Sequence, residues 1–124
     1  MLRNEKGFTL IEIIAVLVIL GILAAAAVPR YISMMDQSRI NAAQTAIAEV
    51  KVQCSNFYAS QMLAGNGTTT VGAVLNSITT SPYLGSDYGV TAETTGSGIK
   101  ISVGTVKNVA LGVAVVGTWY YPGL

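Results

Sequence analysis

Residues 6–28 read KGFTLIEIIAVLVILGILAAAAV, and this stretch decides the fold of the chain. From Phe8 to Val28 there are 21 residues with a single charged side chain, that of Glu12. At the rise of an α-helix such a run is about 30 Å long, which matches the hydrocarbon thickness of a bilayer. The run therefore predicts a membrane-spanning helix. A carboxylate at the depth of Glu12 is costly in a membrane, so its presence indicates a function beyond anchoring.

A short basic leader that ends in Gly7, followed by Phe8, Thr-Leu-Ile-Glu and an apolar helix, resembles the N-terminal segment of the type IV pilins and their type II secretion pseudopilin relatives. The resemblance implies that a prepilin peptidase cuts the leader, residues 1–7, after Gly7 on the cytoplasmic side of the membrane. It also implies that Phe8 becomes the mature N-terminus with a methylated amine, and that Glu12 is the glutamate of the family.

Gly21 and Pro29 stand where the family has a glycine and a helix-bending proline, so the resemblance covers about the first 30 residues. Both residues weaken helical hydrogen bonding locally. The resemblance implies that this segment stretches or unwinds in an assembled filament. The alternative is that Pro29 only kinks the helix where it leaves the membrane.

Glu12 gains a partner if the chain is cut after Gly7, because a new ammonium group then appears on Phe8, about one helical turn away. Each charge lies in or near hydrocarbon, and each needs an opposite charge. We expect the amine of one subunit to meet the carboxylate of a neighbour, which would set the register between packed helices. The alternative is a tolerated glutamate whose side chain snorkels to the membrane surface.

The composition excludes several classes of function. Apolar residues make up 52% of the chain and charged residues only 10%, which is low for a surface fully exposed to water. Without residues 1–7, five basic and five acidic side chains remain, so the mature chain is neutral and suited to self-association. The sequence has no basic patch that would indicate binding to nucleic acid. With no histidine and one cysteine, Cys54, the chain lacks the residues for His-based catalysis and the common zinc sites, so we predict no enzyme, metal or cofactor.

The basic residues place the N-terminus in the cytoplasm, since Arg3 and Lys6 precede the apolar run and only Arg30 follows it closely. An alternative is an ordinary secretory signal cleaved after Ala24-Ala25-Ala26-Ala27. Two features disfavour it: the run is longer than a usual signal core, and Glu12 interrupts it.

Residues 30–64 predict an amphipathic continuation of the same helix, because they contain no Gly or Pro and apolar residues recur at helical spacing. The expected apolar stripe consists of Ile40, Ala43, Ile47, Val50, Cys54 and Phe57, with Tyr58 at its edge. The expected opposite face holds Asn41, Ala42, Thr45, Ala48, Glu49 and Asn56. Gly65-Asn66-Gly67 should end the helix. We expect Cys54 to be a buried, inert thiol, with an intermolecular disulfide or a lipid attachment as alternatives.

Residues 65–124 predict a loop and a small antiparallel sheet. Residues 71–78 suit one or two helical turns. Alternating apolar residues then predict three strands, separated by turns at 94–98 and 104–108. Val109, Leu111, Val113 and Val115 are expected to face the helix. The final aromatic residues, Trp119 to Tyr121, could form a binding patch, a glycan platform or an electron-transfer contact, but we favour packing against the sheet.

Together these features predict an α+β, pilin-like fold: a long N-terminal helix, with a transmembrane half (8–29) and an amphipathic half (30–64), packed on a sheet within 65–124. The predicted function is a structural subunit that polymerises with copies of itself into a type IV pilus-like filament. The resemblance implies the prepilin peptidase, an assembly platform and an ATPase as partners. It also implies that the precursor lies in the inner membrane and the filament outside the cell or, for a pseudopilus, in the periplasm. The alternatives are a type II secretion pseudopilin and a secreted or anchored ligand-binding domain that does not polymerise.

Overall fold

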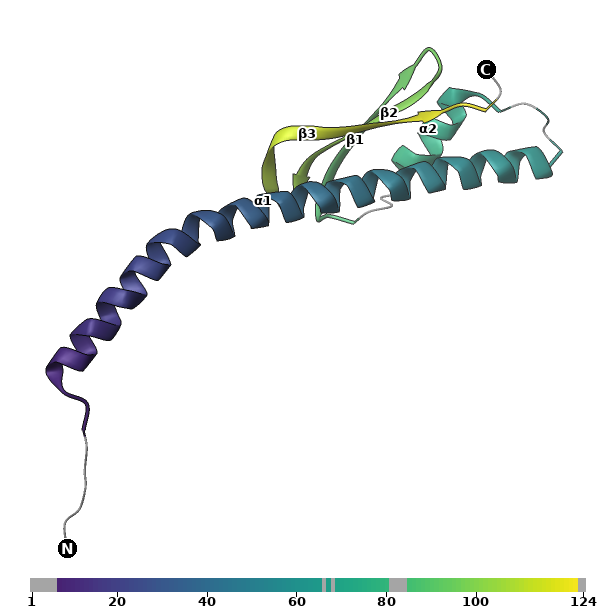
Figure 1. Cartoon of the computed structure of the whole chain (residues 1–124). Coiled ribbons are helices and arrows are strands. Elements are labelled where there is room, and N and C mark those ends of the chain that lie inside the picture. Colours follow the sequence, from purple (N-terminus) through teal and green to yellow (C-terminus); the bar gives the residue numbers. More distant parts are fainter. Residues whose placement is uncertain (1–6, 66, 68, 81–84, 123–124) are drawn as a thin grey trace, which may run out of the picture. The chain divides into compact units, whose positions relative to one another are not determined.

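The computed structural model describes residues 7–65, 67, 69–80 and 85–122 (Figure 1). The chain divides into two compact units, an N-terminal unit (Met1–Met35) and a head unit (Asp36–Leu124). The element order is α1, α2, β1, β2, β3, so the fold is α+β, as predicted. The predicted leader falls on residues 1–7, of which 1–6 lie outside the described residues.

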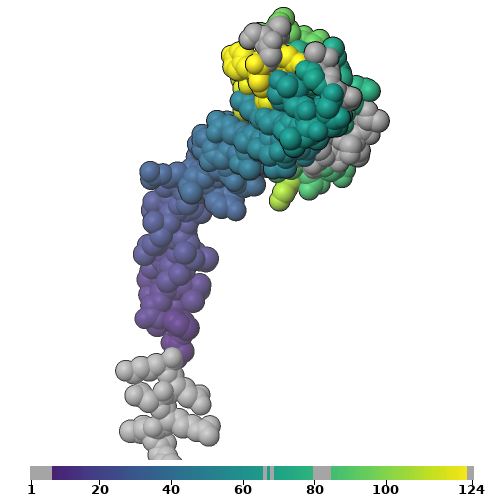
Figure 2. Space-filling model, turned by 90° about the vertical axis from the view of Figure 1, so that its right-hand side faces the viewer, coloured from purple at the N-terminus to yellow at the C-terminus, as the bar shows by residue number. Residues whose placement is uncertain are grey.

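Helix α1 (Leu10–Leu63) runs through both units and contains Pro29 within it. Its first half is long and apolar enough to cross a membrane, and every described residue up to Met35 is exposed. Figure 2 shows these side chains, coloured purple to blue, at the surface of their unit. The helix ends as predicted, because Gly65 takes a φ of +79°, a conformation that favours glycine. Asn66 lies outside the described residues.

Helix α2 (Val71–Thr80) confirms the helical turns expected at 71–78 and extends them. Thr70 caps it, since the Ala73 backbone N–H donates to Thr70 Oγ1 at 3.2 Å. Val74 and Ile78 are buried in the core of the head unit. The sheet is therefore covered by two helices rather than by α1 alone.

Three antiparallel strands in the order β1-β2-β3 form the sheet: β1 (Tyr88–Thr95), β2 (Gly98–Val106) and β3 (Val109–Tyr120). The two turns are shorter than predicted. One consists of residues 96–97, and the other consists of Lys107 and Asn108, which both have a positive φ. Such a two-residue turn matches the twist of a hairpin. The strands therefore pair up to the turns, and they include Gly and Thr residues that the sequence had assigned to turns.

The core of the head unit lies between the second half of α1, α2 and one face of the sheet. The predicted stripe on α1 is confirmed, with Ile40 and Phe57 half-buried at its ends. Ala46 extends the stripe, and Ala42 packs against the core rather than on the opposite face as predicted. The buried residues are Ala43, Ala46, Ile47, Val50, Cys54, Val74, Ile78, Ile99, Ile101, Val103, Val106 and Trp119.

The prediction for the first half of β3 is wrong in part. Leu111 and Val115 pack against the core as expected, but Val113 is 83% exposed and Val109 is also exposed. The cause is a shift in register: Val103 of β2 pairs with Val115, whereas Thr105 pairs with Ala110. Four residues of β3 therefore face a single residue of β2, and Figure 1 shows β3 turning sharply near its start.

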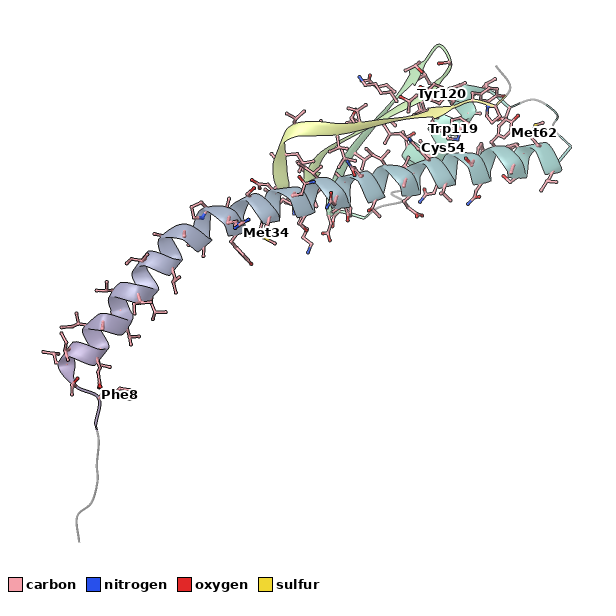
Figure 3. All side chains as sticks on the ribbon, in the orientation of Figure 1. Phe8, Met34, Cys54, Met62, Trp119 and Tyr120 are labelled. Atoms are coloured by element: carbon pink, nitrogen blue, oxygen red, sulfur yellow. The ribbon has the colours of Figure 1, made fainter. Side chains whose placement is uncertain are left out.

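The aromatic residues at the end of β3 pack as predicted. Trp119 is buried, and its Nε1–H donates a hydrogen bond to Ser55 Oγ at 3.0 Å. Tyr58, Trp119 and Tyr121 contact one another edge to face, and the Tyr121 hydroxyl donates to the Thr69 carbonyl oxygen. Figure 3 shows Trp119 and Cys54 between α1 and the sheet. Tyr120, in contrast, is exposed.

Candidate functional site

The N-terminus of α1 is built by a reciprocal pair of hydrogen bonds between Thr9 and Glu12. The Thr9 backbone N–H donates to Glu12 Oε2 at 2.9 Å, and the Glu12 backbone N–H donates to Thr9 Oγ1 at 3.3 Å. The Thr9 carbonyl accepts the first helical bond, from the Ile13 N–H at 3.2 Å. This is a capping box, in which Thr9 is the N-cap and Glu12 the third helical residue.

The capping box gives the Glu12 carboxylate two favourable interactions inside one chain. It accepts a hydrogen bond from a backbone N–H that would otherwise lack a partner, and it lies at the positive end of the helix dipole. Glu12 was predicted to have a role, but Thr9 was not predicted as its partner. The signal was present in the sequence, because Thr-x-x-Glu before an apolar run is a typical helix start.

The predicted cleavage position lies just outside the helix. Gly7, Phe8 and Thr9 precede the first helical residue, Leu10, and the Phe8 side chain is 85% exposed. Figure 3 shows Phe8 at the start of the helix. The Gly7–Phe8 peptide bond is therefore two residues before the helical backbone.

Gly21 and Pro29 do not interrupt α1, which is continuous from Leu10 to Leu63. A side chain added at Gly21 would meet no atom within 4 Å. Pro29 has no N–H, so it cannot donate to the carbonyl oxygen of Ala25 as another residue would. The two residues thus lie within a continuous helix that lacks one backbone hydrogen bond, the one from position 29 to the Ala25 carbonyl oxygen.

In the head unit, Cys54 is fully buried on the apolar stripe. Burial raises the pKa of the Cys54 thiol to about 11, so the thiol is protonated at neutral pH. A protonated, buried thiol is a poor nucleophile, which agrees with the expected inert role. Across the described part of the chain, no three His, Cys, Asp or Glu side chains gather as metal ligands would.

A known protein family matches the N-terminal segment of the chain. The family of the prokaryotic N-terminal methylation motif matches residues 2–28. The chain is 33% identical over 102 residues to the fimbrial protein EcpC of Eikenella corrodens, an alignment that covers 77% of this chain and 66% of EcpC. It is 55% identical over 42 residues to the type II secretion system core protein G of Pseudomonas aeruginosa, covering 34% of this chain and 30% of that protein.

A further relative is the type IV narrow pilus major component PilA5 of Thermus thermophilus, which is 57% identical over 35 residues, or 28% of this chain and 30% of PilA5. The alignments thus span between about a third and two thirds of the length of these three relatives. No solved structure matches the chain. The family motif covers residues 2–28, which include the start of α1 and the capping box.

Proposed function

Because this chain belongs to the type IV pilin family, which includes the pseudopilins, we propose that it is a structural subunit that polymerises through its N-terminal helix into a pilus-like filament. The observation that carries the proposal is the Thr9–Glu12 capping box at the start of a helix whose residues 13–28 are apolar on all sides. A helix of this kind is stable only in a bilayer or among other apolar helices.

Processing supplies the second charge of the proposed contact. A prepilin peptidase cuts between Gly7 and Phe8, and the new amine of Phe8 is methylated. In the isolated subunit the Thr9 N–H and the helix dipole stabilise the Glu12 carboxylate. When a subunit joins the filament, this carboxylate pairs with the Phe8 ammonium of a neighbouring subunit. The attraction between the two charges then offsets the cost of removing them from water.

The apolar surface of residues 8–28 explains where the subunit resides. Before assembly it lies in the inner membrane with its N-terminus in the cytoplasm, and it leaves the lipid only when the filament core offers an equally dry environment. Extraction against that hydrophobic energy requires work, so an assembly platform and an ATPase act with the subunit. Gly21 and Pro29 let the helix adjust its length in the core.

The head unit favours a pilus over a secretion pseudopilus. A resemblance to the major pseudopilins would imply an acidic calcium-binding loop near the C-terminus. After Glu49 the only acidic residues of this chain are Asp87 and Glu93. The match to secretion protein G covers 42 residues, or 34% of this chain. Pseudopilin function is the second candidate, because the match to secretion protein G is 55% identical.

Glu12→Ala tests the proposal in a host that assembles this protein into filaments. The variant should insert into the membrane and be cleaved, but its filament yield in the sheared surface fraction should fall severalfold or more. Glu93→Ala is the matched control, because it removes an exposed carboxylate from the head unit. Intact mass of both proteins should show a chain that starts at methylated Phe8.

Two outcomes would contradict the proposal. Normal filament yield from Glu12→Ala would mean that the carboxylate has no role in assembly. A native chain that starts near Val28 would identify a cleaved secretory signal, and the exported remainder would have no polymerisation helix.

A further inference from the structure

The exposed apolar surface of the N-terminal unit does not end at Pro29. Residues 30–37 read RYISMMDQ, and four of these side chains, Tyr31, Ile32, Met34 and Met35, are between 40% and 67% exposed. They lie on α1 after the 21-residue apolar run, and the N-terminal unit ends at Met35.

This segment differs from the run before it because most of its apolar residues share one face of the helix, whereas Met34 lies nearer the opposite face. Val28, Tyr31, Ile32 and Met35 are spaced by three and four residues and so lie above one another. Arg30, Ser33 and Gln37 follow the same spacing on the opposite face. Residues 13–28, in contrast, are apolar all round. A change from an all-apolar to a one-sided helix is expected where a chain passes from hydrocarbon into the headgroup layer.

Length places the segment at that depth. Residues 8–28 alone span the hydrocarbon core of about 30 Å, so the next two turns lie among the headgroups on the far side. Tyr and Arg are the side chains that suit this layer, since each joins an apolar body to a polar end. The first ion pair along the described helix, between Arg39 Nη1 and Asp36 Oδ1 at 3.0 Å, begins near the end of the segment, at Asp36.

We propose that residues 28–35 bind the outer headgroup layer of the inner membrane, with Val28, Tyr31, Ile32 and Met35 toward the acyl chains and the Arg30 guanidinium on a lipid phosphate. The inference rests on the proposed membrane-resident state of the subunit and extends it. The segment sets the depth of the subunit before assembly, and this contact must be released when a subunit enters a filament.

Site-directed spin labelling of the mature chain in bilayers of phosphatidylethanolamine and phosphatidylglycerol tests the proposal. Single cysteines are placed in turn at residues 28 and 30–37, and the accessibility of each label to oxygen and to a water-soluble nickel complex is measured. Cys54 can stay in place, because it is buried and its thiol pKa is raised. We expect oxygen accessibility to be higher at 28, 31, 32 and 35 than at 30, 33 and 37.

Two variants sharpen the measurement. Tyr31→Ser with Met35→Ser should abolish the periodic difference and shift the labels toward water. Met62→Ser is the matched control, since Met62 is a similarly exposed methionine of α1 in the head unit, and it should change nothing. Bilayers of phosphatidylcholine alone should preserve the pattern, because every phospholipid carries the phosphate. A pattern seen only with anionic lipid would mean that the net charge of the membrane, and not the phosphate common to all phospholipids, determines the contact of Arg30.

Water-like accessibility at every position from 30 onward would overturn the proposal. So would a periodic pattern that appears only at high protein-to-lipid ratio, because the face would then be covered by a second copy of the chain. The pattern should persist in Glu12→Ala, which separates it from polymerisation. If the pattern is absent while Glu12→Ala fails to assemble, only the inference fails. If the pattern is present while Glu12→Ala assembles normally, only the proposed polymerisation contact fails.

Discussion

Gly117 of β3 lets the sheet approach α1 closely, and replacing it with alanine measures how rigid that contact is. A β-carbon at Gly117 would lie 2.4 Å from Ile47 Cγ2 and 3.2 Å from Lys51 Cε. Carbon atoms pack favourably at about 3.5–4.0 Å, so the overlap with Ile47 is more than 1 Å. The Lys51 side chain is flexible and can move. Ile47 is β-branched, buried and restricted to one rotamer in a helix, so the backbone of the strand or the helix must shift.

We expect Gly117→Ala to lower the free energy of unfolding by about 1–3 kcal/mol, the usual cost of overpacking a core. The loss of chain entropy in the unfolded state offsets about 0.4–1 kcal/mol of that cost. Gly112→Ala is the matched control in the same strand, because a β-carbon there would meet no atom within 4 Å. It should raise stability by about 0.4–1 kcal/mol through the same unfolded-state entropy, with no overpacking cost.

A double-mutant cycle with Ile47→Ala isolates the contact. Ile47→Ala alone should cost about 2–5 kcal/mol through the cavity it leaves. In the double variant the new methyl group at position 117 enters that cavity. The stability lost in the double variant should therefore be at least about 0.5 kcal/mol smaller than the sum of the losses in the two single variants. Unfolding in guanidinium, with the protein in detergent micelles, can be followed by the fluorescence of Trp119, the single tryptophan. Strict additivity, or a Gly117→Ala variant as stable as the parent, would refute the argument.

Three further outcomes follow from the head unit. Ser55→Ala should lower stability by about 0.5–1 kcal/mol in the same assay, because the buried Trp119 N–H loses its acceptor while alanine favours the helix. Lys107→Asn combined with Asn108→Gly should raise the free energy of unfolding by about 1 kcal/mol, because both positions have a positive φ, of 50° and 60°. An unchanged unfolding midpoint would argue against strain in this turn. Burial raises the pKa of Cys54 from 9.0 to about 11 in the folded protein, so the stability that its protonated thiol supplies should be lost as the pH rises from 9 through 11, and Cys54→Ala should lack this component when the two titrations are compared.

The elements that the sequence predicted well are those whose cause lies within a few residues. The helix from Leu10 to Leu63 follows from apolar spacing, the absence of Gly and Pro from residues 30–64, and a glycine with positive φ at its end. The Thr9–Glu12 capping box was equally readable, since both partners lie within one turn. It was overlooked because Glu12 was considered only as a charge that needed a partner in another subunit.

The errors concern features that depend on residues distant in the chain. Strict alternation along β3 predicted that Val109 and Val113 would face the helix, yet the register shift opposite Gly104 leaves both exposed. Period-two reasoning assumes uninterrupted pairing, and a bulge changes which side of the sheet each later residue faces. The contribution of α2 to the core was similarly missed, because ten residues of modest apolar character become buried only where a sheet face is available.

The sequence alone therefore determined the long helix, its N-terminal processing motif, the three strands and the family of the chain. Each of these depends on local spacing, on local hydrogen bonds or on a short contiguous pattern. Only the tertiary structure decided the register of β3, the close approach of Ile47 to Gly117 and the hydrogen bond between Trp119 and Ser55. These join residues more than 60 positions apart or depend on the neighbouring strand. Their free energy comes from packing and pairing geometry, which no periodicity along the chain contains.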